Sequence, residues 1–159
     1  MKKTAIVIGA LVLLIAAFFF IAQTNSQKID ASAVKNIEGG ITVFKSSSCG
    51  CCEIYANYLK KNGLDVNVVN TEDLKPLMEN KGVPSALHSC HTSILGDYFV
   101  EGHVPLEAIV KLAAEKPDIK GIAMPGMPSG SPGMPGAKKG PFIIYAVNND
   151  GTYREFMRI

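Results

Sequence analysis

The residues of this sequence best suited to chemistry are its four cysteines. Cys49-Gly-Cys-Cys52 contains the spacings C-x-C, C-x-x-C and C-C at once, and Cys90 stands apart from it, next to His91. Thiolates are soft ligands that select Cu(I), zinc or iron–sulfur centres, and they are also the nucleophiles of disulfide exchange. The cysteines therefore predict a soft-metal site or a redox thiol site.

The elements around Cys49–Cys52 are expected to activate these residues. Ile41-Thr-Val-Phe44 has the β-branched and aromatic residues of a strand, and apolar residues at helical spacing follow the cysteines, up to Gly63. The cysteines thus lie where a strand gives way to a helix. Unpaired N–H groups and the dipole at a helix N-terminus favour thiolate over thiol. Tyr55 and Tyr58 are assigned to the packed face of this helix.

The remaining pattern predicts an α/β chain with the order βαβα followed by ββα, which is the order of a single thioredoxin-like domain. Gly63 and Gly82 are expected to end the first two helices. The further predicted elements are strands at 64–69, 86–95 and 98–100 and helices at 72–81 and 105–116.

This arrangement predicts that Cys90 lies near the other three cysteines. Val83-Pro84 precedes its strand at the place where thioredoxin-like folds have a cis-proline beside the cysteine loop. An even number of cysteines in an oxidising space also allows two structural disulfides. Cys51 and Cys52 disfavour that arrangement, because neighbours bridge only with strain.

Two C-terminal segments extend the domain, which is expected to span 41–159. Residues 119–139 are rich in Met, Pro and Gly and predict an irregular strap, in which Met124 and Met127 offer thioethers that favour Cu(I). Such methionines are equally suited to filling gaps in a core. Residues 141–157 predict a β-hairpin that turns at Asn148-Asn-Asp-Gly151.

The N-terminus predicts export. Residues 1–24 hold two lysines followed by an uncharged apolar run, and its 18 residues from Ala5 to Ala22 would reach roughly 27 Å as a helix. No small-x-small cleavage site lies at the end of the run, so an uncleaved anchor is favoured over a cleaved signal. Residues 25–40 are polar and predict a linker. The domain is thus expected in the periplasm, anchored by residues 4–24 or released.

Composition excludes several classes of function. Lys and Arg number 16 against 14 acidic residues, without a basic block, so no nucleic-acid partner is indicated. No phosphate loop, catalytic Ser/His/Asp order or carboxylate pair is present, and Glu53 and Glu101 suggest no role in a site.

Copper fits the cysteines better than zinc does. A zinc site would use two separated pairs of ligands, but beyond Cys49 and Cys52 the chain offers only Cys90 with His91. Adjacent cysteines point in different directions, which suits bridging between metal ions and favours a multinuclear Cu(I) cluster. His91 and His103 are candidate additional ligands, ahead of His88.

Five ordered segments resemble the CopG-like periplasmic metal-binding proteins of bacterial copper-resistance loci, a thioredoxin-like family of thinly defined role. The resemblance spans about 41–136. The five segments are Lys45-Ser-Ser-Ser-Cys-Gly-Cys-Cys52, Gly82-Val-Pro84, Ser89-Cys-His-Thr92, Val100-Glu-Gly-His-Val-Pro105 and Met124-Pro-Gly-Met-Pro-Ser-Gly-Ser-Pro-Gly-Met134.

The resemblance implies a thioredoxin-like fold, copper bound by Cys49, Cys51, Cys52 and Cys90, nearby His or Met helpers, and a part in redox handling or detoxification of copper. The chain departs from the family in Ser46–Ser48, where a proline and a threonine are more usual. It departs again in the hairpin, for which we expect no counterpart in many relatives. Neither departure removes a ligand.

Three hypotheses follow. The leading one is an exported Cu(I)-binding protein of copper resistance, with copper ions, periplasmic copper carriers or exporters and, if uncleaved, the membrane as partners. The second is a thiol–disulfide oxidoreductase that uses Cys49 and Cys52, with Cys90 as a resolving thiol. The third is an inert module closed by disulfides that presents the strap to a partner. The pattern does not decide whether the protein is an enzyme.

Overall fold

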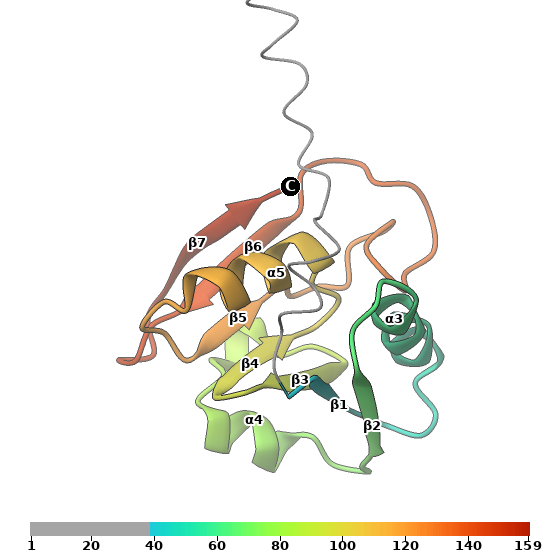
Figure 1. The fold of residues 1–159 in the computed structure, drawn as a ribbon, viewed down its shortest axis with the longest axis horizontal. Coiled ribbons are helices and arrows are strands. Elements are labelled where there is room, and N and C mark those ends of the chain that lie inside the picture. Colours follow the sequence, from blue (N-terminus) through green and yellow to red (C-terminus); the bar gives the residue numbers. More distant parts are fainter. Residues whose placement is uncertain (1–38) are drawn as a thin grey trace, which may run out of the picture.

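The computed structural model describes residues 39–159 (Figure 1). The predicted leader and all but the last two residues of the predicted linker lie outside this range. Among the described helices, none is long and apolar enough to cross a membrane. The elements are β1 (Ile41–Lys45), α3 (Gly50–Lys61), β2 (Val66–Asn70), α4 (Lys75–Lys81), the 3-10 turn η1 (Ser85–Leu87), β3 (His91–Leu95), β4 (Tyr98–Glu101), α5 (Leu106–Glu115), β5 (Gly121–Ala123), β6 (Ile143–Val147) and β7 (Tyr153–Arg158).

Within residues 39–159, the strands form one seven-stranded mixed sheet with the order β2-β1-β3-β4-β5-β6-β7. β1 and β2 are parallel and are joined through α3, whereas β3 is antiparallel to both β1 and β4. β5 lies parallel to β4, and β6 and β7 continue the sheet as an antiparallel pair. The predicted order βαβα followed by ββα is therefore confirmed, and the chain is an α/β protein.

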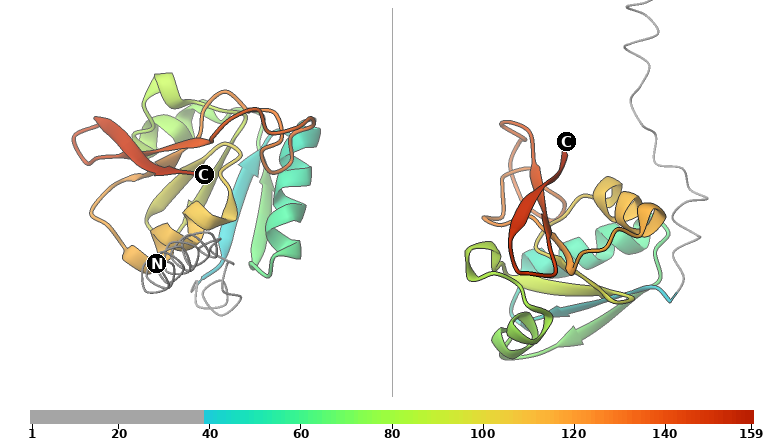
Figure 2. Two further views of the ribbon diagram at one scale, coloured as in Figure 1. Left: turned by 90° about the horizontal axis from the view of Figure 1, so that it is seen from above. Right: turned by 90° about the vertical axis from the view of Figure 1, so that its left-hand side faces the viewer.

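The two faces of the sheet carry separate hydrophobic cores. On one face, α3 and α5 pack against strand residues such as Val100, with Tyr55 fully buried between them. On the other face, Met78 of α4 packs near Phe99. Figure 2 shows α4 on the opposite side of the sheet from α3 and α5. Successive residues of β4 thus serve different cores, as the alternation of a strand requires.

Three elements differ from the prediction. α4 begins at Lys75 rather than at residue 72, because the Asp73 carboxylate accepts the Lys75 N–H at 2.9 Å and holds the turn before the helix. The predicted strand at 86–95 is regular only from His91, because residues 85–87 form a 3-10 turn and the Ser89 N–H is bound by a side chain instead of a neighbouring strand. The peptide before Pro84 is trans, so the cis-proline expected at this position is not observed.

The third difference is β5, which lies within the segment predicted to be irregular. It has three residues, too few to show a period of alternation. Gly121 occupies a place where a Cβ atom would overlap the carbonyl oxygen and ring of Phe99. A glycine that would weaken most strands is therefore required here, because β5 lies so close to β4.

The rest of the strap, residues 124–139, packs onto the start of α3. Its turns use glycines with positive φ, at 126, 130, 133 and 136. Gly133, at φ +84°, lies so close to α3 that a Cβ atom would be 2.8 Å from the Cys51 carbonyl oxygen and 2.9 Å from the Tyr55 nitrogen. The strap is therefore fitted against the helix turn that carries the cysteines.

Replacing Gly133 by alanine tests this contact. Gly133→Ala should destabilise the domain by about 1–3 kcal/mol through overpacking, in addition to about 1–2 kcal/mol for the left-handed backbone. Gly126→Ala is the matched control, because Gly126 has φ +82° and nothing within 4 Å of the added Cβ atom. Chemical unfolding of both variants measures the difference, and equal destabilisation would show that the strap does not press on α3.

Candidate metal centre

The loop after β1 places three cysteines at the N-terminus of α3. Cys49 is the N-cap residue, and Cys51 and Cys52 lie in the first turn, where backbone N–H groups have no partners within the helix. Cys49 and Cys52 form a disulfide, and the Cys51 sulfur lies 3.5 Å from that of Cys49. Cys52 is fully buried and Cys51 half-buried. The cluster therefore has an inner and an outer side.

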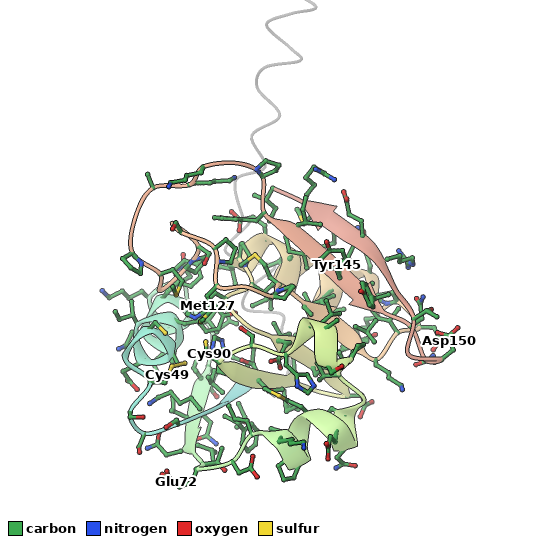
Figure 3. The ribbon with its side chains drawn as sticks, turned by 180° about the vertical axis from the view of Figure 1, so that it is seen from behind. Cys49, Glu72, Cys90, Met127, Tyr145 and Asp150 are labelled. Atoms are coloured by element: carbon green, nitrogen blue, oxygen red, sulfur yellow. A yellow bond between two sulfur atoms is a disulfide. The ribbon has the colours of Figure 1, made fainter. Side chains whose placement is uncertain are left out.

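Cys90 reaches this cluster because β3 pairs with β1. Lys45, the last residue of β1, lies opposite His91, the first residue of β3. The two strands therefore have the cysteine loop and Cys90 at the same end (Figure 3). The sulfurs of Cys49, Cys51, Cys52 and Cys90 all lie within 4.8 Å of one another. The predicted proximity of Cys90 to the other three is thus observed.

Two histidines also converge on Cys90. The Cys90 sulfur lies 3.4 Å from Nδ1 of His91 and 3.1 Å from Nε2 of His103. The three donor atoms lie within 4.8 Å of one another. Cys90 therefore belongs both to a four-sulfur group and to a Cys-His-His group.

A hydrogen bond to the strap determines which nitrogen of His103 carries the hydrogen and which presents a lone pair to Cys90. Nδ1 of His103 lies 2.6 Å from the Pro132 carbonyl oxygen, and a carbonyl can only accept, so Nδ1 carries the hydrogen. In the neutral ring, Nε2 is then the unprotonated nitrogen. A ring N–H bonded to a backbone carbonyl is the usual arrangement behind a metal-binding histidine.

Burial keeps these groups neutral. Burial lowers the pKa of His91 to about 3, with a smaller contribution from His103, and it also lowers the pKa of His103, against the opposing effect of the bond to Pro132. Burial and the neighbouring Cys51 raise the pKa of the Cys90 thiol to about 12. A metal ion bound by Cys90 must therefore displace its proton, while the imidazoles present lone pairs.

A tyrosine packs both histidine rings against the core. The ring centroid of Tyr55 lies 4.5 Å from that of His91 and 5.4 Å from that of His103, and its hydroxyl donates to the Val104 carbonyl at 2.9 Å. Tyr58 accepts the Leu106 N–H at 3.2 Å. The assignment of both tyrosines to the packed face of the helix is confirmed. In addition, Tyr55 holds the histidines in place.

The other candidate ligands are distributed differently. Met124 is buried in the core on the α3 face, with 1% of its surface exposed, so it serves as core packing there. Met127 is 41% exposed on the strap, on the same side of the molecule as Cys49 and Cys90 (Figure 3). His88 lies 3.1 Å from the Val83 carbonyl oxygen, outside both groups of donors.

Comparisons with known proteins agree with this geometry. Residues 87–134 match the family described as "Protein of unknown function, DUF411". The solved structure "Copper resistance protein copG- Form 2" is 36% identical, with a TM-score of 0.70 over 75% of this chain and 96% of that one. "Copper resistance protein copG- Form 1" is also 36% identical, with a TM-score of 0.69 over 75% of this chain and 95% of that one. No curated protein matches the chain.

The chain belongs to the CopG-like family. The identity extends over nearly the whole length of the solved relatives, so the resemblance inferred from five segments is confirmed. In this CopG-like protein, four sulfurs and two imidazole nitrogens lie together as candidate donor atoms, a set that suits copper. While Cys49 and Cys52 are joined, only Cys51 and Cys90 are thiols, so four-thiolate binding requires reduction of the disulfide.

Three residues of this centre were not predicted as part of it. Glu101 binds the segment that carries Cys90, Pro132 orients His103, and Gly133 allows the strap to approach α3. The contributions of Pro132 and Gly133 depend on backbone position, which residue type does not reveal. Glu101 was set aside because a single carboxylate at a strand end has no characteristic spacing.

A thiol count tests the bonding state. The metal-free, unreduced protein, unfolded in guanidinium, should show two reactive thiols, from Cys51 and Cys90, and four after reduction. Peptide mapping after alkylation should identify Cys49 and Cys52 as the bonded pair. Absence of any free thiol before reduction would instead favour the inert module closed by disulfides.

Proposed function

We propose that this protein is an exported copper-binding protein of copper resistance that holds Cu(I) in a multi-cysteine site. The observation that carries the proposal is the convergence of four sulfurs within 4.8 Å of one another. Thiolates favour Cu(I), and two solved structures with 36% identity are titled copper resistance proteins.

A multinuclear cluster is favoured over a single ion. The Cys52 side chain is fully buried whereas that of the adjacent Cys51 is half-buried, so the two neighbouring sulfurs differ in their access to solvent. Such a pair suits bridging between ions better than chelation of one. Zinc suits the site less well, because its structural sites use four separated ligands in one tetrahedron.

His91 and His103 are proposed as additional ligands through Cys90, which lies within 3.4 Å of a nitrogen of each ring. Met127 is a candidate thioether ligand because it is exposed on the strap, which packs against the start of α3 through Gly133. Met124 was also predicted as a ligand. We give its sulfur the smaller role because the side chain is enclosed in the core.

A thioredoxin-like fold and export complete the proposal. The strand order β2-β1-β3-β4, with α3 and α5 on one face and α4 on the other, supports the thioredoxin-like assignment. The apolar residues 4–24 support delivery to the periplasm, as an anchor or a cleaved signal. Periplasmic copper carriers or exporters are the expected protein partners.

Anaerobic titration of the reduced domain with Cu(I), in competition with a chromophoric chelator, tests the proposal. Wild type should bind at least one ion tightly. Loss of a group that only supports a ligand lowers metal affinity by about 10- to 100-fold, and Cys90→Ser, which removes a ligand, should lower it by more than that. Cys51→Ser combined with Cys52→Ser should do the same. His103→Ala should also weaken Cu(I) binding, whereas the matched control His88→Ala should not, because His88 lies outside the donor groups. Unchanged binding in the cysteine variants would refute a shared thiolate site.

The second candidate function is thiol–disulfide exchange. It is supported by the Cys49–Cys52 disulfide at a helix N-terminus, which has the C-x-x-C spacing of redox enzymes.

Insulin reduction in the presence of a copper chelator and a thiol reductant separates the two functions. The copper proposal predicts a rate close to that of Cys49→Ser, which cannot form the disulfide. A rate well above that of Cys49→Ser would establish the enzyme instead, because catalysis by a C-x-x-C pair needs no metal.

A further inference from the structure

Glu101, the last residue of β4, binds the chain on both sides of two candidate ligands. Its Oε1 accepts the Ser89 N–H at 2.6 Å, and its Oε2 accepts the Thr92 hydroxyl at 2.6 Å. Cys90 and His91 are the two residues enclosed between these contacts. One carboxylate thus spans the short segment that delivers a sulfur and an imidazole to the centre.

The backbone at Glu101 joins this segment to the third ligand of the Cys-His-His group. The Gly102 N–H donates to the His91 carbonyl at 3.0 Å, and His103 follows directly. Gly102, at φ +78°, is so enclosed that a Cβ atom would be 2.8 Å from the Ser89 hydroxyl oxygen. The segments 89–92 and 101–103 are therefore fitted together at the carboxylate.

The Glu101 carboxylate lies on the opposite face of the sheet from the His91 ring. Glu101 lies opposite Thr92 in the pairing of β4 with β3, and alternate strand residues place it on the α4 face, whereas His91 faces α3. Its side chain is fully buried, and burial raises the pKa of the carboxyl to about 7. A buried carboxyl group is costly unless its oxygens are bonded, and here both are.

We propose that Glu101 is a positioning residue of the copper centre, which holds Cys90 and His91 in register with His103 through its bonds to Ser89 and Thr92. The inference rests on the proposed copper function. The two bonds flank the pair of candidate ligands, because Ser89 directly precedes Cys90 and Thr92 directly follows His91.

Two substitutions separate hydrogen bonding from charge. Glu101→Met fills similar space but accepts no hydrogen bond, so the Cu(I) affinity of the reduced protein should fall by about 10- to 100-fold. Glu101→Gln should rescue the affinity to near wild type, because its carbonyl oxygen can accept from Ser89 while its amide donates to the Thr92 oxygen. The absorption bands of the Co(II)-loaded protein should change in Glu101→Met and be retained in Glu101→Gln.

Tyr98→Phe is the matched control. It lies at the other end of β4 and removes a hydrogen bond of similar length, from the Tyr98 hydroxyl to the Pro117 carbonyl at 2.8 Å. Unfolding of the metal-free variants measures stability, and Tyr98→Phe should lose stability without changing the Cu(I) affinity or the Co(II) bands. Equal loss of affinity in Tyr98→Phe and Glu101→Met would show that Glu101 only stabilises the fold, and the inference would be wrong.

The remaining outcomes also decide the inference. If Glu101→Met does not fold, Thr92→Val removes only the second bond, and unchanged affinity and Co(II) bands in this variant would overturn the role of the carboxylate. Wild-type affinity in Glu101→Met would overturn it directly. Absence of Cu(I) binding by the wild-type protein would contradict the proposed function itself, and the positioning role with it.

Discussion

The antiparallel pairing of β1 with β3 is the interaction on which the cysteine centre depends. The register that sets Lys45 opposite His91 brings the loop leaving β1 and the residue entering β3 to one end of the sheet. A slip of one residue would turn His91 to the opposite face, away from Tyr55 and α3. One strand pair thus brings together Cys52 and Cys90, which are 38 positions apart in the sequence.

The centre combines a buried side with an accessible one. His91, His103 and Cys52 are buried, so two neutral imidazoles and one sulfur are held at low dielectric, whereas Cys51 and Cys90 are partly exposed. Burial disfavours the Cys90 thiolate. A soft cation offsets that cost by replacing the proton, which couples copper binding to proton release. Under the proposed function, copper and the disulfide would compete for Cys49 and Cys52, because a sulfur in a disulfide is not a thiolate ligand.

The C-terminal extension completes the centre without supplying a cysteine. β5 continues the sheet next to β4, and the strap then crosses to α3, where the Pro132 carbonyl accepts a hydrogen bond from Nδ1 of His103. The hairpin β6–β7 widens the sheet on the other edge, and it is joined to β5 rather than to the cysteine loop. The strap therefore acts on the centre through backbone contacts, and the hairpin supports the sheet that carries them.

Local patterns were sufficient for much of this protein. The cysteine spacing, the strand before it, the helix after it and the Asn148–Gly151 turn depend on near neighbours in sequence, and the structure contains each of them. The His91 and His103 predictions rested on residue type, and the structure brings both rings to Cys90. β5 was missed because three residues have no periodicity, and its glycine is explained only by the nearness of Phe99.

The sequence by itself determined which soft donor atoms the chain carries and that three of them begin a helix, because these properties follow from residue type and local periodicity. Only the tertiary structure decided that the Cys90 sulfur joins them, which nitrogen of His103 faces it, and that Glu101 binds both sides of the Cys90–His91 pair. These depend on strand register and on contacts between residues that lie 9 or more positions apart. Several of the contacts are made by a backbone carbonyl or N–H, which has no signature in the sequence.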